Sequence, residues 1–257
     1  MALRRIILAG VTVLFGAACS ILPGSPEPPP AVQLGAAPET PTGPRYPGAT
    51  VHPSGFYQFD QWPKACDLLT DADFRTIFPQ VTETRRVSEN RTLEFLPVLV
   101  PGAARPPDTP DKVRVTDAAC TVALAIPGID FDPAAEIYMS GAQVMVEVGA
   151  AGSAEVVQLN GPKPATGAQE ITVGAARCYG TAGANELSCL TPHVAFEVWT
   201  EIDYNIQDDE QNIIRYQRGA ETTAWPRDGG PDGVARRWEW ERSVITPELV
   251  KAIAAKL

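Results

Sequence analysis

The chain has 257 residues, of which 44% are apolar and 20% are charged, and both values are ordinary for a globular protein. Its formal net charge is -10, because 31 acidic residues outnumber 21 basic ones. A surface of this sign repels nucleic acid and anionic lipid headgroups, so we expect cationic or neutral partners and no binding to nucleic acid.

The N-terminus has the features of an export signal. Arg4 and Arg5 precede an apolar stretch over residues 6–15, which is too short to span a bilayer. The Arg pair leaves two export routes open, the general secretory route and the twin-arginine route. We predict that residues 1–18 are a signal peptide.

Small residues come directly before Cys19, with Gly16 at the position where the lipobox of bacterial lipoproteins usually has Leu. This arrangement resembles a lipobox, which predicts that Cys19 becomes the first residue and carries a diacylglyceryl thioether and a further acyl chain such as palmitate. Two or three chains hold a protein on a membrane far better than one. Cleavage after Ala18 without lipidation is the alternative. The predicted location is the outer face of the cytoplasmic membrane.

Residues 20–55 are rich in Pro, Gly, Ala and Thr and have no apolar periodicity. We therefore predict a lipidated Cys and a disordered tether over 19–55, with a reach of about 100 Å if extended. One extracytoplasmic domain then occupies 56–257, a length that suits a single domain.

The domain begins with a helix signal. Thr70 followed by Asp73 is typical of a capping box, and Pro79 ends the pattern, so we predict a helix over 71–78. A Pro-rich loop is expected over 96–112. Apolar alternation or β-branched residues then predict strands over 113–115, 120–126, 143–149, 155–159, 170–173 and 196–204.

The C-terminal quarter mixes ambiguous and clear signals. Residues 208–219 fit a helix or a strand, and residues 225–233 fit a loop. Thr246 as N-cap and Pro247 after it predict an amphipathic C-terminal helix. The expected fold class is α+β: a mostly antiparallel sheet with an N-terminal short helix, a C-terminal amphipathic helix and two disulfides.

Lipidation of Cys19 would leave four cysteines in an oxidising compartment, with three possible pairings. We favour Cys66–Cys120 and Cys178–Cys189. The local argument concerns the second pair, because a hairpin centred on residues 183–184, with Gly183 first in a type II′ turn, places Cys178 opposite Cys189. A structural zinc site is not expected, because CxxC is absent and His52 and His193 have no cysteine at ligand spacing.

The segment 66–73 (CDLLTDAD) resembles the opening motif of an actinobacterial lipoprotein family known as domain of unknown function 3558. Cys120, the segment 173–176 and the Ala-rich C-terminus match later features of that family. Val122 stands where the family often has an aromatic residue, and 208–233 resembles an insertion. The resemblance implies the Cys66–Cys120 pairing, the envelope location and the α+β class, and it supplies no reaction.

No catalytic, cofactor or metal residues are predicted. The sequence has no G-x-S-x-G or S-x-x-K motif, which leaves His193 as the best candidate for hydrolytic chemistry. An acidic cluster resembles a calcium loop but lacks the EF-hand pattern, so we interpret it as solvated; it comprises Asp203, Asn205, Asp208, Asp209 and Glu210. Trp225, Trp238 and Trp240 suit a sugar- or lipid-binding cleft or core packing, the last two on a strand-like face.

We expect a membrane-anchored, non-catalytic binding or accessory module of the cell envelope, with an envelope protein or a small molecule as ligand. One alternative is an extracytoplasmic enzyme acting on wall polymers or lipids, which needs a cleft with convergent acids or a Ser/His pair. The other is a sensor-like domain that acts through a partner.

Overall fold

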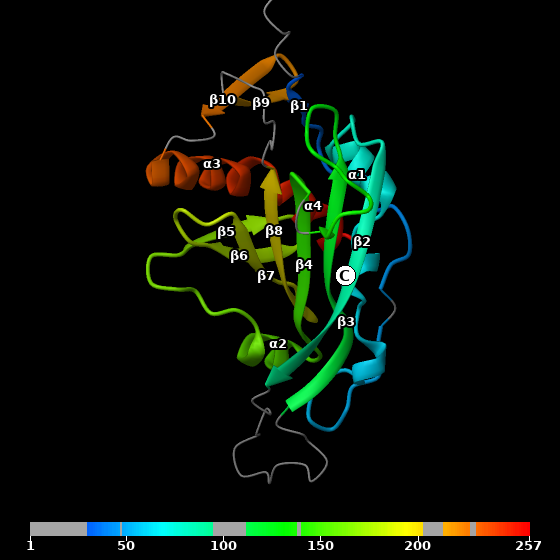
Figure 1. Cartoon of the computed structure of the whole chain (residues 1–257). Coiled ribbons are helices and arrows are strands. Elements are labelled where there is room, and N and C mark those ends of the chain that lie inside the picture. Colours follow the sequence, from blue (N-terminus) through cyan, green and yellow to red (C-terminus); the bar gives the residue numbers. More distant parts are fainter. Residues whose placement is uncertain (1–29, 47, 95–111, 138–139, 203–212, 227–229) are drawn as a thin grey trace, which may run out of the picture.

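The computed structural model describes residues 30–46, 48–94, 112–137, 140–202, 213–226 and 230–257 (Figure 1). A seven-stranded antiparallel sheet has the order β2-β3-β4-β8-β7-β6-β5, and a small sheet has the order β1-β9-β10. The large sheet consists of β2 (Glu83–Glu94), β3 (Lys112–Ala125), β4 (Ala142–Ala151), β5 (Gln169–Val173), β6 (Ala176–Gly180), β7 (Glu186–Leu190) and β8 (Val194–Ile202). The small sheet consists of β1 (Val32–Gln33), β9 (Ile213–Arg218) and β10 (Glu221–Pro226).

Helices complete the fold. They are α1 (Asp71–Ile77), α2 (Ala154–Asn160), α3 (Gly230–Val244) and α4 (Thr246–Ala254), with short 3₁₀ helices η1 (Phe59–Gln61) and η2 (Ala65–Asp67). The predicted α+β class, with mostly antiparallel strands and a C-terminal helix, is confirmed. Among the described residues, no helix combines the length and apolar character needed to cross a bilayer.

The core lies between one face of the large sheet and the helices α1 and α4. Val144, Val146 and Val148 are buried on that face of β4, as their alternation predicts. Leu249 and Ile253 of α4 are fully buried, and α4 contacts the strands β5 to β8. Burial of these side chains is the main force that holds α4 on the sheet.

The start of α1 has the predicted capping box. The Thr70 side chain accepts a hydrogen bond from the Asp73 backbone N–H at 3.2 Å, and the Asp73 carboxylate accepts one from the Thr70 backbone N–H at 2.7 Å. Two N–H groups that the first turn leaves without helical partners are thereby satisfied. At α4 the structure differs by one residue: Ile245 is the N-cap, and Thr246 lies inside the helix.

Both favoured disulfides are present, Cys66–Cys120 and Cys178–Cys189. Cys178 pairs with Cys189 in the β6–β7 register, as the hairpin argument requires. The turn itself is different, because Ala184 N–H donates to Thr181 O at 3.2 Å. Gly183 is therefore the second central residue, with φ 77°, and the turn is not type II′.

Two predicted elements are wrong. Residues 155–159 form α2 and not a strand, because Ser153 caps the backbone N–H of Val156 and the two valines of the helix pack inward together. Residues 230–233, expected in a loop, belong to α3, and Trp238 and Trp240 are helical rather than strand residues. Two tryptophans two residues apart, with charged residues between and around them, fit a helix as well as a strand. The sequence pattern alone therefore does not distinguish the two.

Other strands extend or replace what the sequence predicts. The predicted strands 113–115 and 120–126 join into β3 around Asp117, whose positive φ of 57° accompanies a register shift in the pairing with β2. The strand β2 was missed because its residues are polar on both faces, as an edge strand permits. Within the described part of the ambiguous segment, residues 213–218 form the strand β9.

The described part of the predicted tether packs on the domain. Residues 30–46, which we name the strap, place Val32 and Leu34 in the core, with exposed fractions of 1% and 8%. Gly35 N–H donates to Ile77 O and Tyr46 N–H donates to Lys256 O, both at 2.8 Å. The prediction of a disordered segment up to residue 55 is therefore wrong for residues 30–46. It is also wrong for residues 48–55, where Val51 pairs with Tyr57 and Ser54 is buried, so the packed domain begins at the strap.

Candidate functional site

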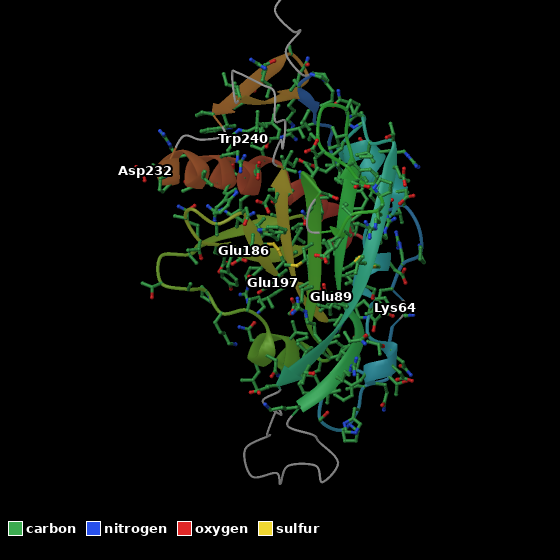
Figure 2. All side chains as sticks on the ribbon, viewed as in Figure 1. Lys64, Glu89, Glu186, Glu197, Asp232 and Trp240 are labelled. Carbon is green, nitrogen blue, oxygen red and sulfur yellow. A yellow bond between two sulfur atoms is a disulfide. The ribbon has the colours of Figure 1, made fainter. Side chains whose placement is uncertain are left out.

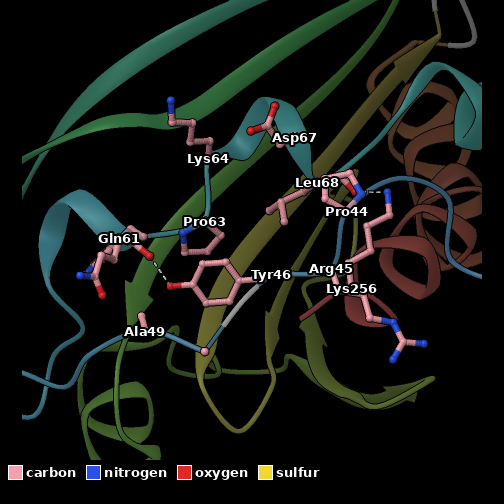
Figure 3. A pocket seen from close by; sticks show the side chains of 12 residues that line it. Pro44, Arg45, Tyr46, Ala49, Gln61, Pro63, Lys64, Asp67, Leu68 and Lys256 are labelled. Carbon is pink, nitrogen blue, oxygen red and sulfur yellow. Dashed lines mark hydrogen bonds between the residues drawn. The ribbon is translucent and has the colours of Figure 1, made fainter.

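A pocket of about 380 Å³ lies between the end of the strap and the segment 61–68 (Figure 3). We name it the strap pocket. Its lining combines aromatic and aliphatic groups with a few charged ones: Pro44, Arg45, Tyr46, Gly48, Ala49, Gln61, Trp62, Pro63, Lys64, Asp67, Leu68 and Lys256. Ligand pockets of proteins have volumes of roughly 300–1,000 Å³ and a similar composition.

The disulfide Cys66–Cys120 fixes one wall of the strap pocket, because it ties η2 to β3, the strand next to the sheet edge. Trp62 is buried, and its indole N–H donates to Tyr57 O at 3.1 Å. This hydrogen bond and the disulfide hold the segment 61–68 at both ends. The wall is therefore built on rigid elements.

Tyr46, at the end of the strap, lies against the segment 61–68. Its hydroxyl donates a hydrogen bond to Gln61 O, which links the strap to η1. Burial, together with the neighbouring Tyr57, raises the pKa of Tyr46 to about 12. The phenol therefore stays protonated at neutral pH and keeps donating to Gln61 O.

Charged groups surround the apolar wall, where Figure 3 shows Tyr46, Pro63 and Leu68 near one another. Lys64 forms an exposed ion pair with Asp117 at 3.5 Å. The Lys256 ammonium is buried, donating to Leu68 O at 2.9 Å. Arg45 and Asp67 are exposed. The pocket therefore offers an apolar wall with charged groups of both signs around it, which suits a small amphipathic molecule.

The Lys256 ammonium also forms an ion pair with the Asp73 carboxylate at 2.5 Å, and both side chains are buried. Burial alone would raise the pKa of Asp73, but hydrogen bonds from Lys256, Thr42 and Thr70 outweigh it and lower the pKa below its ordinary value. The strap, α1 and the turn that follows α4 meet at this carboxylate. The group is thus a structural junction directly behind the strap pocket.

A second hollow of about 290 Å³ adjoins the strap pocket and shares Pro44 and Asp67 with it. Its other lining residues are Cys66, Leu69, Thr70, Asp71 and Arg86. Arg86 forms an ion pair with Asp71 at 2.5 Å and donates to Leu69 O at 3.1 Å. The two hollows are neighbouring depressions that meet at Asp67 of η2.

His193, the candidate for hydrolytic chemistry, is exposed after β7. Its ring contacts the Gly152 carbonyl, at 3.3 Å from Nδ1, and the Tyr57 ring, at 6.1 Å between centroids. The other histidine, His52, has Nδ1 at 2.8 Å from the Ser54 hydroxyl and also accepts the Ser54 backbone N–H at 3.1 Å. Ser54 is 2% exposed, so this contact stabilises a local turn and does not present a nucleophile to solvent.

Two of the three tryptophans of the predicted cleft, Trp225 and Trp240, pack near each other. Trp240 packs on Tyr216, with ring centroids 4.6 Å apart, and Trp225 lies 6.4 Å from Trp240. The associated hollow, also lined by Leu34, has a volume of about 110 Å³. This is below the usual range of a ligand pocket, so the contacts are structural.

Several predicted residues lie outside the described part of the chain. They are Cys19 and the acidic cluster Asp203, Asn205, Asp208, Asp209 and Glu210. Within the described residues, no group of three or more His, Cys, Asp or Glu side chains has the geometry to hold a metal ion.

Sequence reasoning missed an acidic row on the open face of the large sheet, where Figure 2 labels Glu89, Glu197 and Glu186. Glu147 lies directly opposite Glu197 in the β4–β8 register, and Arg91 contacts Glu147 at 3.3 Å. Burial and Glu197 raise the pKa of Glu147 and of Glu186, and Glu89 adds to the effect on Glu147. The row arises from strand pairing, which single-strand patterns do not reveal.

No family model, curated protein or solved structure matches this chain significantly. The resemblance of the segment 66–73 to a lipoprotein family therefore stays a prediction.

Proposed function

We propose that the protein is an exported lipoprotein, held by an acylated Cys19 on the outer face of the cytoplasmic membrane. Its domain acts as a non-catalytic binding or accessory module of the cell envelope. The predicted N-terminal export signal supports a location outside the cytoplasmic membrane. The pairing of all four remaining cysteines is compatible with an oxidising compartment. Membership of the actinobacterial family of domain of unknown function 3558 is part of the same proposal.

The strap pocket is the observation that carries the binding role. Its volume of about 380 Å³ has room for a small organic molecule, and its walls are fixed by a disulfide and by hydrogen bonds. An apolar part of the ligand would pack on Tyr46 and Leu68, while a polar part would face Lys64 and Asp67. The backbone of the segment 61–68 is already held by the disulfide and needs little ordering on binding, which favours affinity.

Anchoring is tested with the variant Cys19→Ala. We expect the wild-type chain in the membrane fraction and the variant in the soluble fraction, because without the thiol no thioether forms. A variant that stays with the membranes contradicts the proposal. Mass spectrometry of the wild-type N-terminus gives an independent reading of the acyl chains.

Ligand binding is tested by native mass spectrometry of protein purified from envelope extract, and with anilinonaphthalene sulfonate as an amphipathic fluorescent probe. The variant Gly48→Trp places a ring at the pocket, and a Cβ at this position meets nothing within 4 Å. The control Thr166→Trp adds the same ring at an exposed loop position. We expect probe fluorescence and any retained mass to disappear in Gly48→Trp only. Equal signals in both variants would exclude the strap pocket as the ligand site.

A further inference from the structure

The strap leaves a short chain between the predicted anchor and the domain. Val32 is 1% exposed, and Leu34 N–H donates to Gln217 O at 2.8 Å, so packing begins shortly after Pro30. Residues 20–29 therefore separate Cys19 from the packed part. Fully stretched, the chain from Cys19 to Pro30 spans at most about 40 Å. A tether that ran to residue 55 would reach more than twice as far.

The anchor chain enters the domain at the small sheet. Val32 and Gln33 of β1 pair in parallel with Tyr216 and Gln217 of β9. Figure 1 shows β1, β9 and β10 together at one end, while the end of β2 and the start of β3 lie at the other. With about 3.3 Å per residue, the 14 residues of β3 alone extend over roughly 43 Å. The anchor chain thus places the two ends of the domain at different distances from the membrane.

The outward face of the small sheet is less acidic than expected for a chain with a net charge of -10. Ile214 and Tyr216 are buried, so the alternate residues point outward. At the outward positions that the structure describes on these strands, Arg215 is charged and no carboxylate occurs. The others are polar, small or apolar: Gln33, Ile213, Gln217, Thr222, Ala224 and Pro226. The exposed Glu221, at the turn end of β10, lies opposite Arg218 in the register. This face avoids the repulsion between an acidic surface and anionic headgroups.

We propose that the outward face of the small sheet lies against the phospholipid headgroups of the outer leaflet, with the β2–β3 end directed away from the membrane. The orientation rests on the lipid anchor proposed above. It follows from the short anchor chain, from its entry point at β1 and from the lack of outward carboxylates on the face nearest the anchor. The domain therefore works close to the bilayer and not at a distance within the cell wall.

The experiment uses the full lipidated chain in vesicles of phosphatidylcholine and phosphatidylglycerol that contain a lipid with a nitroxide on its headgroup. A fluorophore is attached to a cysteine that replaces Ala220, in the exposed turn between β9 and β10, or Thr92, an exposed residue near the far end of β2. We expect several-fold stronger quenching at position 220 than at position 92. Equal quenching at the two positions, or stronger quenching at position 92, overturns the orientation.

A flexible Gly/Ser insertion of about 25 residues between Pro29 and Pro30 serves as the matched variant, because it restores the reach of the longer tether. We expect most of the difference between the two positions to disappear; an unchanged difference would refute the role of the short anchor chain. Vesicle flotation separates the two proposals. Protein that does not float refutes the lipid anchor itself, whereas floating protein with uniform quenching refutes only the orientation.

Discussion

The buried ion pair between Asp73 and Lys256 allows a test of how much a contact between α1 and the C-terminus contributes to the free energy of unfolding. The variant Lys256→Met keeps most of the side-chain volume but leaves the Asp73 carboxylate, which is 0% exposed, without its cation. Removal of one partner from a buried pair destabilises a protein by about 3–5 kcal/mol. The Leu68 carbonyl also loses its donor, so we expect a value in the upper half of this range.

Lys251→Met is the matched control, because Lys251 lies in α4, shortly before Lys256, and pairs with Glu248 at 2.9 Å with its side chain 46% exposed. Glu248 keeps its second cation, Arg218, in this variant. An exposed pair contributes about 0–1 kcal/mol, so the control should remain near wild type. Urea unfolding of the oxidised domain, followed by tryptophan fluorescence, measures both free energies of unfolding. Similar losses in the two variants would refute the reasoning.

The same ion pair predicts a pH dependence. The pKa of Asp73 is lowered in the folded protein, so its contribution to stability is fully present above the unfolded pKa of about 3.9. It is lost as the pH falls through the lower folded pKa. Wild type should therefore lose more stability than the variant Asp73→Asn when the pH is lowered from 5 toward 2, and parallel curves would contradict the assignment.

Three further predictions concern the sheet, the disulfides and the strap. Glu197→Gln should raise the free energy of unfolding by about 0.5–1 kcal/mol, because it removes a charge directly opposite Glu147; calorimetry that shows destabilisation would contradict this. Replacement of both cysteines of a bridge by Ser should lower the free energy of unfolding, because the unfolded chain loses a constraint. We expect a loss of about 4 kcal/mol for the bridge with a sequence separation of 54 and about 3 kcal/mol for the bridge with a separation of 11. The opposite order in thermal unfolding would count against the chain-entropy argument. Gly35→Ala should detach the strap, because a Cβ would lie 2.1 Å from Thr76 O; limited proteolysis should cleave this variant near the strap faster than the control Gly48→Ala, whose Cβ meets nothing within 4 Å.

The sequence predicted correctly those features that depend on interactions between residues close together in the chain. The capping box of Thr70 and Asp73 needs only residues within one helical turn. The pairing of Cys178 with Cys189 follows from a short hairpin, and the buried valines of β4 follow from alternation. These features are independent of the rest of the chain.

The strap and its pocket depend on contacts between distant segments. The strand β1 has two residues and pairs with β9, whose partner residues lie 184 positions later in the chain. Proline, glycine and alanine around it conceal the alternation of Val32 and Leu34, which is the one local signal of burial. The pocket forms only when residues 44–49, the segment 61–68 and Lys256 come together, so composition in the N-terminal segment suggested a linker.

The last helix and the turn after it hold segments of the N-terminal third in place, since Lys256 contacts Leu68 and Asp73 and Glu248 accepts the backbone N–H of Ala37. The partners in these three contacts are separated by 183 to 211 residues in the sequence. A nascent chain therefore cannot close until synthesis has delivered its last few residues, and such non-local closure is slow.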